Sequence, residues 1–502
     1  MHADALARRL LPQRRRGAEE HQLTATSGRS SRSEYRWAQT QTDEVSRNFS
    51  VPPCLCGSFL VAAVKRAFAP LLALALLWPS FAAAGPKIES WQTPNGARVL
   101  FVAAPELPMV DVRVVFDAGS ARDAARPGLA ALANELLTEG AGPWSADELA
   151  ARTEAVGASL GSDSLRDMAY VSVRSLTEPK ALDVAVETLA AVVAAPRFEA
   201  GDIERLRNAR LVSLRQQEQS AGSVASKAFY RTLYGDHPYA SDPDGTSESV
   251  TAITREALQE FHRRYYVARN AVVAIVGALD RAQAEALAQR VTASLPAGER
   301  PGTVSEPRAP APGEHPVTFP STQTHIYLGQ LGMARDDPDY FPLLVGNHVL
   351  GSSGLVSLLG EEVRNKRGLS YSVYSGLLPM RQTGPFMAVA QTKNSQTAEA
   401  LAVIRQTIAD FVKDGPTAKK LDEAKRNLTG GFPLRIASNG KIVEQLAVIG
   451  FYDYPLDWLD TYVAKVDAVT VEQVRDAFRR RIDPNRAIVV VVGGDRAAPS
   501  GG

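Results

Sequence analysis

Histidine and cysteine side chains are the residues of this chain best suited to hold a catalytic metal, and their spacing argues against such a site. The two cysteines are Cys54 and Cys56, a pair without further ligands beside it. No two histidines lie within one helical turn of each other; they are His2, His21, His237, His262, His315, His325 and His348. Structural and catalytic zinc sites need three or four converging ligands. We therefore expect no metal site in the folded part of the chain.

A second group of chemically capable residues surrounds Arg364 and Tyr371. Gly368 is a natural helix stop, and residues 369–374 alternate as a strand does. Arg364 is therefore expected at the end of a helix and Tyr371 early on the next strand, where both side chains could converge at one sheet edge. By residue type alone, they could equally be a surface arginine near a helix end and a tyrosine packed in a core.

Helical periodicity predicts a helix within residues 127–137. Its buried stripe consists of Leu129, Leu132, Ala133 and Leu136. Its opposite face carries Ala131, Asn134, Glu135 and Thr138. Such a face could hold zinc if two histidines stood one turn apart on it. Ala131 and Asn134 exclude that chemistry, because a methyl group cannot bind zinc and an amide cannot take a proton from an attacking water.

The residues around this helix resemble the pitrilysin/insulinase superfamily of zinc metallopeptidases. The likeness rests on the runs Phe116-Asp117-Ala118-Gly119-Ser120, Gly128-Leu129-Ala130 and Glu139-Gly140. In that superfamily, His-x-x-Glu-His follows Gly-Leu-Ala. Carried over position by position, the first zinc ligand falls on Ala131, the general base on Asn134, the second ligand on Glu135 and the third ligand near Leu206. The resemblance thus implies a noncatalytic member with a degenerate zinc motif.

The same resemblance implies roles for residues elsewhere. Arg364 and Tyr371 match an Arg-x-Lys-x-x-Leu-x-Tyr arrangement, in which the arginine holds substrate backbone or carboxylate and the tyrosine donates a hydrogen bond to the oxyanion of the tetrahedral intermediate. A substrate-binding loop, flexible in noncatalytic subunits, matches Gly351, Ser352, Ser353 and Gly354. A segment that binds peptide by adding it to an exposed sheet edge matches Gly157, Ala158, Ser159 and Leu160. Small residues of this kind equally suit ordinary turns.

Composition bounds the class of protein. With 45% hydrophobic and 22% charged residues, the chain has the make-up of an ordinary globular protein, and its 502 residues favour two or more domains. A net charge of +1 gives no reason to expect nucleic acid as a partner.

The first 84 residues differ from the rest. Residues 1–63 are rich in arginine and serine without sustained apolar periodicity, which favours a disordered or misassigned leader. Residues 64–84 combine Lys65 and Arg66, a short apolar run and three alanines, which is typical of a signal peptide cleaved after Ala84. A single membrane anchor is the alternative, but the run is short and interrupted by prolines. We expect export to the periplasm, with no membrane span in the mature chain.

The remainder repeats itself. Residues 250–256 precede a helix and the strand at 271–277, and residues 466–472 precede a helix and the strand at 487–493, at a constant offset. The sequence therefore predicts an α+β protein of two homologous α/β-sandwich domains, with helices on one face of a mainly antiparallel sheet, forming a half-clamshell. We place the domains at 87–295 and 318–496, joined by a Pro-rich linker at 296–317.

Three functions remain open. The chain could be the catalytically incomplete subunit of a heterodimeric periplasmic zinc metallopeptidase, with a homologous HxxEH-containing partner supplying zinc and this chain supplying Arg364 and Tyr371 to a peptide substrate. It could instead be a nonenzymatic peptide-binding or envelope-assembly module with a peptidase-like fold. A peptidase active on its own would need metal ligands that the sequence lacks.

Overall fold

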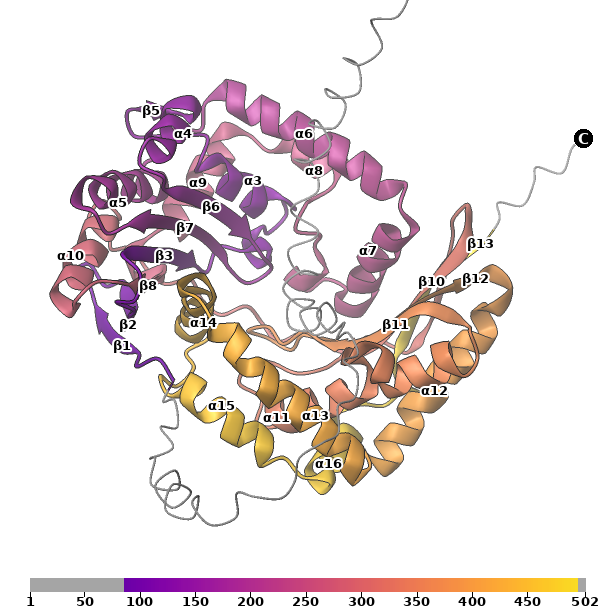
Figure 1. Ribbon diagram of the computed structural model, residues 1–502. Helices are drawn as coiled ribbons and strands as arrows, with labels where there is room; N and C mark the ends of the chain where they lie inside the picture. Colours follow the sequence, from indigo (N-terminus) through magenta and orange to yellow (C-terminus); the bar gives the residue numbers. More distant parts are fainter. Residues whose placement is uncertain (1–84, 495–502) are drawn as a thin grey trace, which may run out of the picture.

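The computed structural model describes residues 85–494, which form two similar halves (Figure 1). The leader predicted at 1–63, the signal peptide at 64–84 and the last two residues of the predicted 318–496 domain lie outside this range.

The first half contains a six-stranded sheet with helices packed on it. In spatial order its strands are β1 (Glu89–Gln92), β2 (Arg98–Ala103), β8 (Ala271–Gly277), β3 (Met109–Phe116), β7 (Ala169–Leu176) and β6 (Ser159–Ser164). A short hairpin joins β4 (Gly140–Ala141) and β5 (Trp144–Ser145). The helices are α3 (Leu129–Leu136), α4 (Ala146–Glu154), α5 (Pro179–Ala194), α6 (Ala200–Glu218), α7 (Ala221–Tyr234), α8 (Ser247–Ala252), α9 (Arg255–Tyr265) and α10 (Arg281–Thr292).

The second half is built on a five-stranded sheet. Its strands in spatial order are β11 (Ser370–Leu377), β12 (Pro385–Lys393), β10 (Ser321–Leu331), β13 (Ile488–Gly494) and β9 (Gly313–Thr318). Its α-helices are α11 (Tyr340–Asn347), α12 (Thr397–Asp414), α13 (Ala418–Gly431), α14 (Asn439–Phe451), α15 (Trp458–Asp467) and α16 (Val471–Arg481). It also contains two π-helical segments, η5 (His348–Ser352) and η7 (Gly360–Asn365), and the 3-10 turns η6 (Gly354–Val356), η8 (Asn394–Gln396) and η9 (Phe432–Ile436).

The topology of the two sheets confirms the predicted repeat. Each sheet has one parallel pair, β2 with β8 and β13 with β9, and the other neighbouring strands run antiparallel. The equivalent helices α9 and α16 begin in the same way, because Thr254 and Thr470 each accept a hydrogen bond from the backbone N–H three residues on. The α+β class with mainly antiparallel sheets is therefore confirmed.

One helix of each half packs on the sheet of the other half, an arrangement that the sequence repeat did not predict. Helix α14 of the second half packs on β8 and β3, while α7 of the first half packs on β10 and β13. A glycine permits each crossing: a Cβ on Gly450 would collide with Val272, and one on Gly329 would collide with Phe229. Helices therefore cover both faces of each sheet, and the exchanged pair joins the halves through buried apolar contacts.

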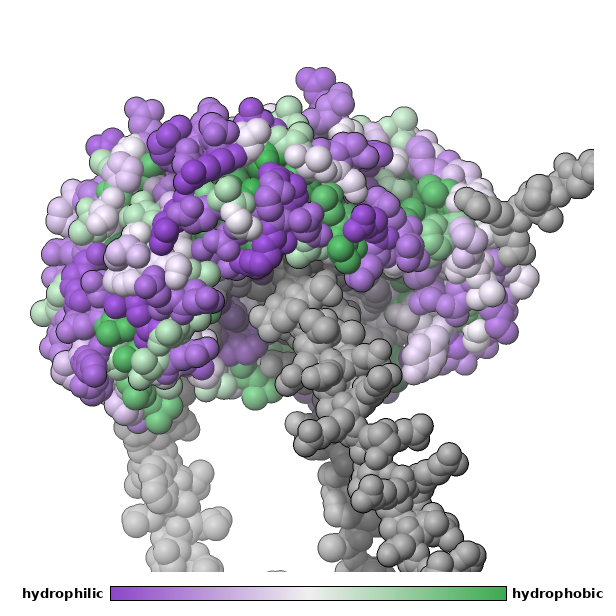
Figure 2. All heavy atoms as spheres, turned by 90° about the horizontal axis from the view of Figure 1, so that it is seen from above, coloured by the Kyte–Doolittle hydropathy of each residue, from purple (hydrophilic) through white to green (hydrophobic). Residues whose placement is uncertain are grey.

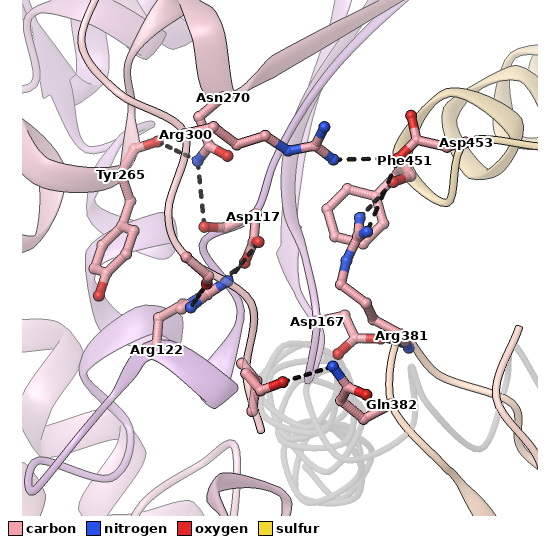
Figure 3. A network of polar contacts seen from close by, with 12 residues as sticks. Asp117, Arg122, Asp167, Tyr265, Asn270, Arg300, Arg381, Gln382, Phe451 and Asp453 are labelled. Atoms are coloured by element: carbon pink, nitrogen blue, oxygen red, sulfur yellow. Dashed lines mark hydrogen bonds and ion pairs between the residues drawn. The ribbon is translucent and has the colours of Figure 1, made fainter. Parts of the chain in front are cut away.

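The linker is shorter than predicted, and polar contacts join it to both halves. Strand β9 begins at Gly313, inside the predicted range of 296–317, because its backbone pairs with β13 at the sheet edge, where Pro316 is tolerated. Upstream of it, the carbonyl of Gly302 accepts a hydrogen bond from Arg122 at 2.8 Å, and Arg300 lies 3.4 Å from Asp453 of the second half (Figure 3).

A buried carboxylate, Asp167, ties the halves together beside this linker (Figure 3). Its oxygens accept hydrogen bonds from the hydroxyl of Tyr239 in the first half and from the hydroxyl of Tyr452 in the second, the latter at 2.9 Å. The backbone N–H of Arg381 donates a third bond at 2.7 Å. Asp167 follows β6, and its partners come from three distant segments, so its hydrogen bonds link the two halves.

Replacing Asp167 with asparagine is expected to lower the free energy of unfolding by about 2 kcal/mol, because hydrogen bonds to a charged acceptor are worth more than those to an amide. Chemical denaturation of the purified chain measures the change. Asp422→Asn on the exposed side of α13 is the matched control and should leave the midpoint unchanged. Equal stability of both variants would show that Asp167 does not join the halves.

Two further observations concern the apolar character of the helices and of the surface. Within residues 85–494, no helix combines the length and apolar character that crossing a membrane requires. Hydrophilic residues make up most of the face shown in Figure 2, and hydrophobic residues lie between them in small groups.

Candidate functional site

Helix α3 carries the degenerate zinc motif, and a buried carboxylate binds the backbone N–H groups at its start. Asp123 accepts hydrogen bonds from the backbone N–H groups of Gly128 at 2.8 Å and Ala130 at 2.7 Å, which satisfies two donors at the helix start. Within the helix, Ala131 is buried, and Asn134 donates to the carbonyl of Tyr170 at 3.3 Å and to the hydroxyl of Tyr266 at 3.2 Å. Asn134 therefore acts as a core amide that joins α3 to its neighbours.

Glu135 is the one member of the motif with a ligand-type side chain, and it is bound by an arginine. Its carboxylate lies 2.6 Å from the guanidinium of Arg210, which lies 3.2 Å from Asp244 as well. Arg210 and Asp244 are both buried. The residue of α6 that faces Glu135 is thus Arg210, one helical turn beyond Leu206, where the third ligand was expected; Leu206 itself packs against the apolar core.

The electrostatics of this cluster are those of a buried cation held by acids. Burial lowers the pKa of Arg210, but Glu135 and Asp244 outweigh burial and raise the pKa above its ordinary value. Burial also raises the pKa of Asp123 to about 8, although its two backbone donors and Arg210 act in the opposite direction. The helix with the degenerate motif therefore faces an arginine–carboxylate cluster, and these residues do not fit zinc. No group of three or more potential metal ligands occurs within residues 85–494.

A large cavity lies between the two halves and has a volume of about 2300 Å³. Asp163, Asp244 and Tyr170 are among the residues of the first half that line it, and Arg364 and Tyr371 line it from the second half. Burial raises the pKa of Tyr170 to about 12, although Arg113 beside it acts in the opposite direction. The cavity is large enough for an extended peptide segment rather than a small metabolite alone.

Arg364 and Tyr371 converge. The guanidinium carbon of Arg364 lies 4.3 Å from the centre of the Tyr371 ring, which is a cation–π distance. Tyr371 is 83% exposed, so its hydroxyl is open to a ligand in the cavity. Arg364 forms no ion pair with any residue in the described range. The pair therefore has free donors on the cavity wall of the second half.

Irregular backbone at both positions explains this orientation. Arg364 lies in the π-helical segment η7, and Tyr371 lies where the pairing of β11 with β12 shifts register between Ser370 and Ser372. The hydroxyl of Ser370 fixes the bulge by donating to the carbonyls of Ser372 and Gln391. Bulges and π-helical turns both redirect side chains and are frequent at functional sites.

The loop of Gly351, Ser352, Ser353 and Gly354 lines the cavity, as its expected role requires. Its first residue is fixed rather than free, because Gly351 is buried and a Cβ there would collide with Ser375 of β11. Gly354 has φ +63°, a conformation that favours glycine.

The predicted peptide-binding segment lies at the edge of the first sheet. Gly157 and Ala158 precede β6, and Ser159 and Leu160 begin it at the edge of the sheet. These four residues are not among those that line the cavity, which instead meets the far end of β6 at Asp163, Ser164 and Leu165. A peptide added to this edge would enter the cavity at that far end.

Sequence reasoning missed Arg210. It is one of several arginines on α6, and its spacing gives no sign that it faces α3. Its burial could not be recognised without the fold, because charged residues on a helix are normally solvent-exposed.

Two family models match successive parts of the chain, and the boundary between them lies before α9, inside the first half. Residues 98–246 match the family described as insulinase (peptidase family M16), and residues 252–428 match the family described as peptidase M16 inactive domain. Among solved structures, the peptidase M16 inactive domain from Pseudomonas fluorescens shares 41% identity and superposes with a TM-score of 0.79, covering 82% of this chain and 98% of that one.

Some curated relatives are named as zinc proteases, and another is named as a non-peptidase homolog. An uncharacterized zinc protease of Mycobacterium leprae is 29% identical over 390 residues, covering 76% of this chain and 86% of the relative. A non-peptidase homolog from Helicobacter pylori is 25% identical over 391 residues, covering 77% of this chain and 89% of the relative.

Proposed function

The chain belongs to peptidase family M16, and from that premise we propose that it is the noncatalytic subunit of a two-chain zinc peptidase of the periplasm. A homologous partner chain with an intact HxxEH motif supplies the zinc site. This chain encloses the peptide against that partner and contributes Arg364 and Tyr371 to the reaction.

One observation carries the proposal: the cavity retains an exposed donor pair while the motif helix of the same chain lacks metal ligands. Arg364 and Tyr371 line the cavity 4.3 Å apart, whereas Glu135 is held by Arg210. A chain that only binds peptides has less need of an exposed phenol and a guanidinium placed side by side on the cavity wall. A chain that works beside a metal-bearing partner has such a need.

The chemistry of the pair suits transition-state stabilisation. The planar guanidinium of Arg364 offers paired N–H donors to a peptide carbonyl or carboxylate. The hydroxyl of Tyr371 donates to the oxyanion that develops when the carbonyl is attacked. Neither group is needed to activate the water, which is the task of the partner's metal.

The periplasm is proposed as the compartment on the basis of the leader sequence. Cleavage after Ala84 would leave a mature chain without cysteine, because both cysteines precede that point, and such a chain suits an oxidising periplasm. N-terminal sequencing of the exported protein tests the cleavage site.

The central experiment is co-expression with the related exported chain that carries HxxEH, followed by a peptide cleavage assay. We expect the two chains to copurify and cleave peptides in a chelator-sensitive manner, and each chain alone to be inactive. Replacing the glutamate of the partner's HxxEH is the control and should abolish cleavage without preventing assembly. Chelator-sensitive cleavage by this chain purified alone would reject the proposal.

The second candidate is a nonenzymatic peptide-binding or envelope-assembly module. The relative named as a non-peptidase homolog favours it, since that name attaches to a protein of similar length. This function predicts peptide affinity for the isolated chain and no metal-dependent cleavage with any partner. The same copurification and cleavage assay separates the two functions.

A further inference from the structure

His348 is a buried polar residue in the cavity wall with an unused hydrogen-bonding atom. It lies on η5, directly before the Gly351–Gly354 loop, and is 7% exposed. Its Nε2 atom has no hydrogen-bond partner among residues 85–494, although the residue lines the cavity. Buried polar atoms are nearly always paired, so an unpaired one in a cavity wall is available for a hydrogen bond with a molecule in the cavity.

The charged neighbour of His348 is a cation. Burial and the nearby guanidinium of Arg435 together lower the pKa of His348 to about 4, although Asn427 of α13 acts in the opposite direction. Arg435 lines the same cavity from η9. Its Nη1 reaches the hydroxyl of Tyr462 at 3.5 Å, and it has no ion pair with a carboxylate in the described part of the chain.

The internal repeat allows the surroundings of His348 to be compared with those of the equivalent residue in the first half. Ala133-Asn134-Glu135-Leu136-Leu137 of the first half corresponds to Gly346-Asn347-His348-Val349-Leu350 of the second. Each asparagine donates to a strand carbonyl at 3.3 Å, Asn134 to Tyr170 of β7 and Asn347 to Ser375 of β11, although these two strands are not equivalent in the repeat. In this sequence alignment, Glu135 corresponds to His348. Glu135 is paired with Arg210, whereas His348 and the nearby Arg435 have no carboxylate partner among residues 85–494.

The charged side chains that line the cavity are distributed unevenly between the two halves. Its lining from the first half includes seven acidic and four basic side chains, and its lining from the second half includes two acidic and five basic ones. The two acidic residues that line the cavity from the second half both have cationic partners. Glu423 pairs with Lys419 at 4.0 Å, and Glu444 pairs with Arg113 at 3.4 Å. The wall around His348 and Arg435 therefore favours an anion.

We propose that His348, Arg435 and Asn427 form a carboxylate-binding subsite that takes an acidic group of the peptide held in the cavity. The guanidinium of Arg435 provides the charge and paired donors, and His348 and Asn427 provide neutral hydrogen bonds beside it. The carboxylate is either an Asp or Glu side chain or the free C-terminus of the peptide. This subsite rests on the proposed peptide-binding function and adds a charge preference to it.

The test measures binding of fluorescent dodecapeptides to the full chain by polarisation. One pair of peptides differs by Glu against Gln at a central position, and a second pair differs by a free against an amidated C-terminus. We expect the wild-type chain to prefer a carboxylate in one of these pairs by about tenfold. The pair that shows the preference identifies the source of the carboxylate.

Variants assign that preference to the subsite. Arg435→Gln and His348→Leu should each remove most of it while leaving the neutral peptide bound as before. Arg426→Gln is the matched control, because Arg426 is an exposed cation that lines the same cavity from α13, and it should preserve the preference. Melting temperatures of all variants check that the fold is intact.

The outcomes separate the subsite from the proposed function. Peptide binding without any preference for a carboxylate, or a preference that both subsite variants retain, rejects the subsite alone. A loss of equal size in Arg426→Gln assigns the preference to the general charge of the wall and also rejects it. If no peptide binds to the chain or to its complex with the partner, the subsite and the proposed function both fail.

Discussion

Replacing Tyr371 with phenylalanine is expected to lower the turnover of the assembled peptidase about 100-fold, the cost of losing one oxyanion donor. The substitution removes one hydroxyl and keeps the aromatic ring, so the cation–π contact with Arg364 at 4.3 Å persists. Since the ring is 83% exposed, no buried contact is lost either. Steady-state kinetics of the complex should show the loss in kcat, with little change in KM.

Tyr170→Phe provides the matched control for that experiment. Tyr170 lines the same cavity from the first half, and its ring carries the guanidinium of Arg113 at 4.1 Å, so the same chemical change is made beside the same kind of cation. Its turnover should stay close to that of the wild type. Should Tyr371→Phe retain full activity in a complex that assembles normally, the role of Tyr371 in the reaction is refuted.

Replacing Arg210 with methionine is expected to lower the free energy of unfolding by about 3–5 kcal/mol, because it leaves acidic groups in a buried site without their cation. Arg210 and Asp244 are each 5% exposed at the side chain, and Glu135 is 42% exposed. Methionine retains much of the volume, so the loss reports the charge rather than a void. Chemical denaturation followed by circular dichroism measures it.

Arg205→Met on the same helix is the control. Arg205 likewise contacts two carboxylates, Glu139 and Asp202, but its side chain is 54% exposed, and solvent-screened pairs of this kind contribute at most about 1 kcal/mol. The double variant Arg210→Met, Glu135→Gln should recover part of the loss by removing one uncompensated charge. Equal destabilisation by the two arginine variants would show that burial of the cluster does not strengthen its ion pairs.

The repeat was readable from the sequence because it is recorded in local patterns. The threonine caps, the amphipathic helices and the apolar strands recur at a constant offset, and each depends on residues close together in the chain. The end of the linker was not readable, since Gly313 to Thr318 become a strand only through pairing with β13, more than 150 residues away.

The predicted convergence of Arg364 and Tyr371 was a local inference as well, because only six residues separate them. The sequence could place one at a helix end and the other on a strand, but not the π-helical turn or the bulge that direct them to the cavity. Those irregularities depend on β12, whose register with β11 leaves the extra residue unpaired.

By itself, the sequence determined where zinc chemistry does not take place, because the atoms that Ala131 and Asn134 can offer to a metal are properties of their side chains in any fold. Only the tertiary structure decided what stands there instead. Arg210 meets Glu135 and Asp244 because α6 packs beside α3, and residues of both halves line the cavity because the halves pack against each other. Residues far apart in the chain are brought together by the burial of apolar surface between whole elements, which no local pattern records.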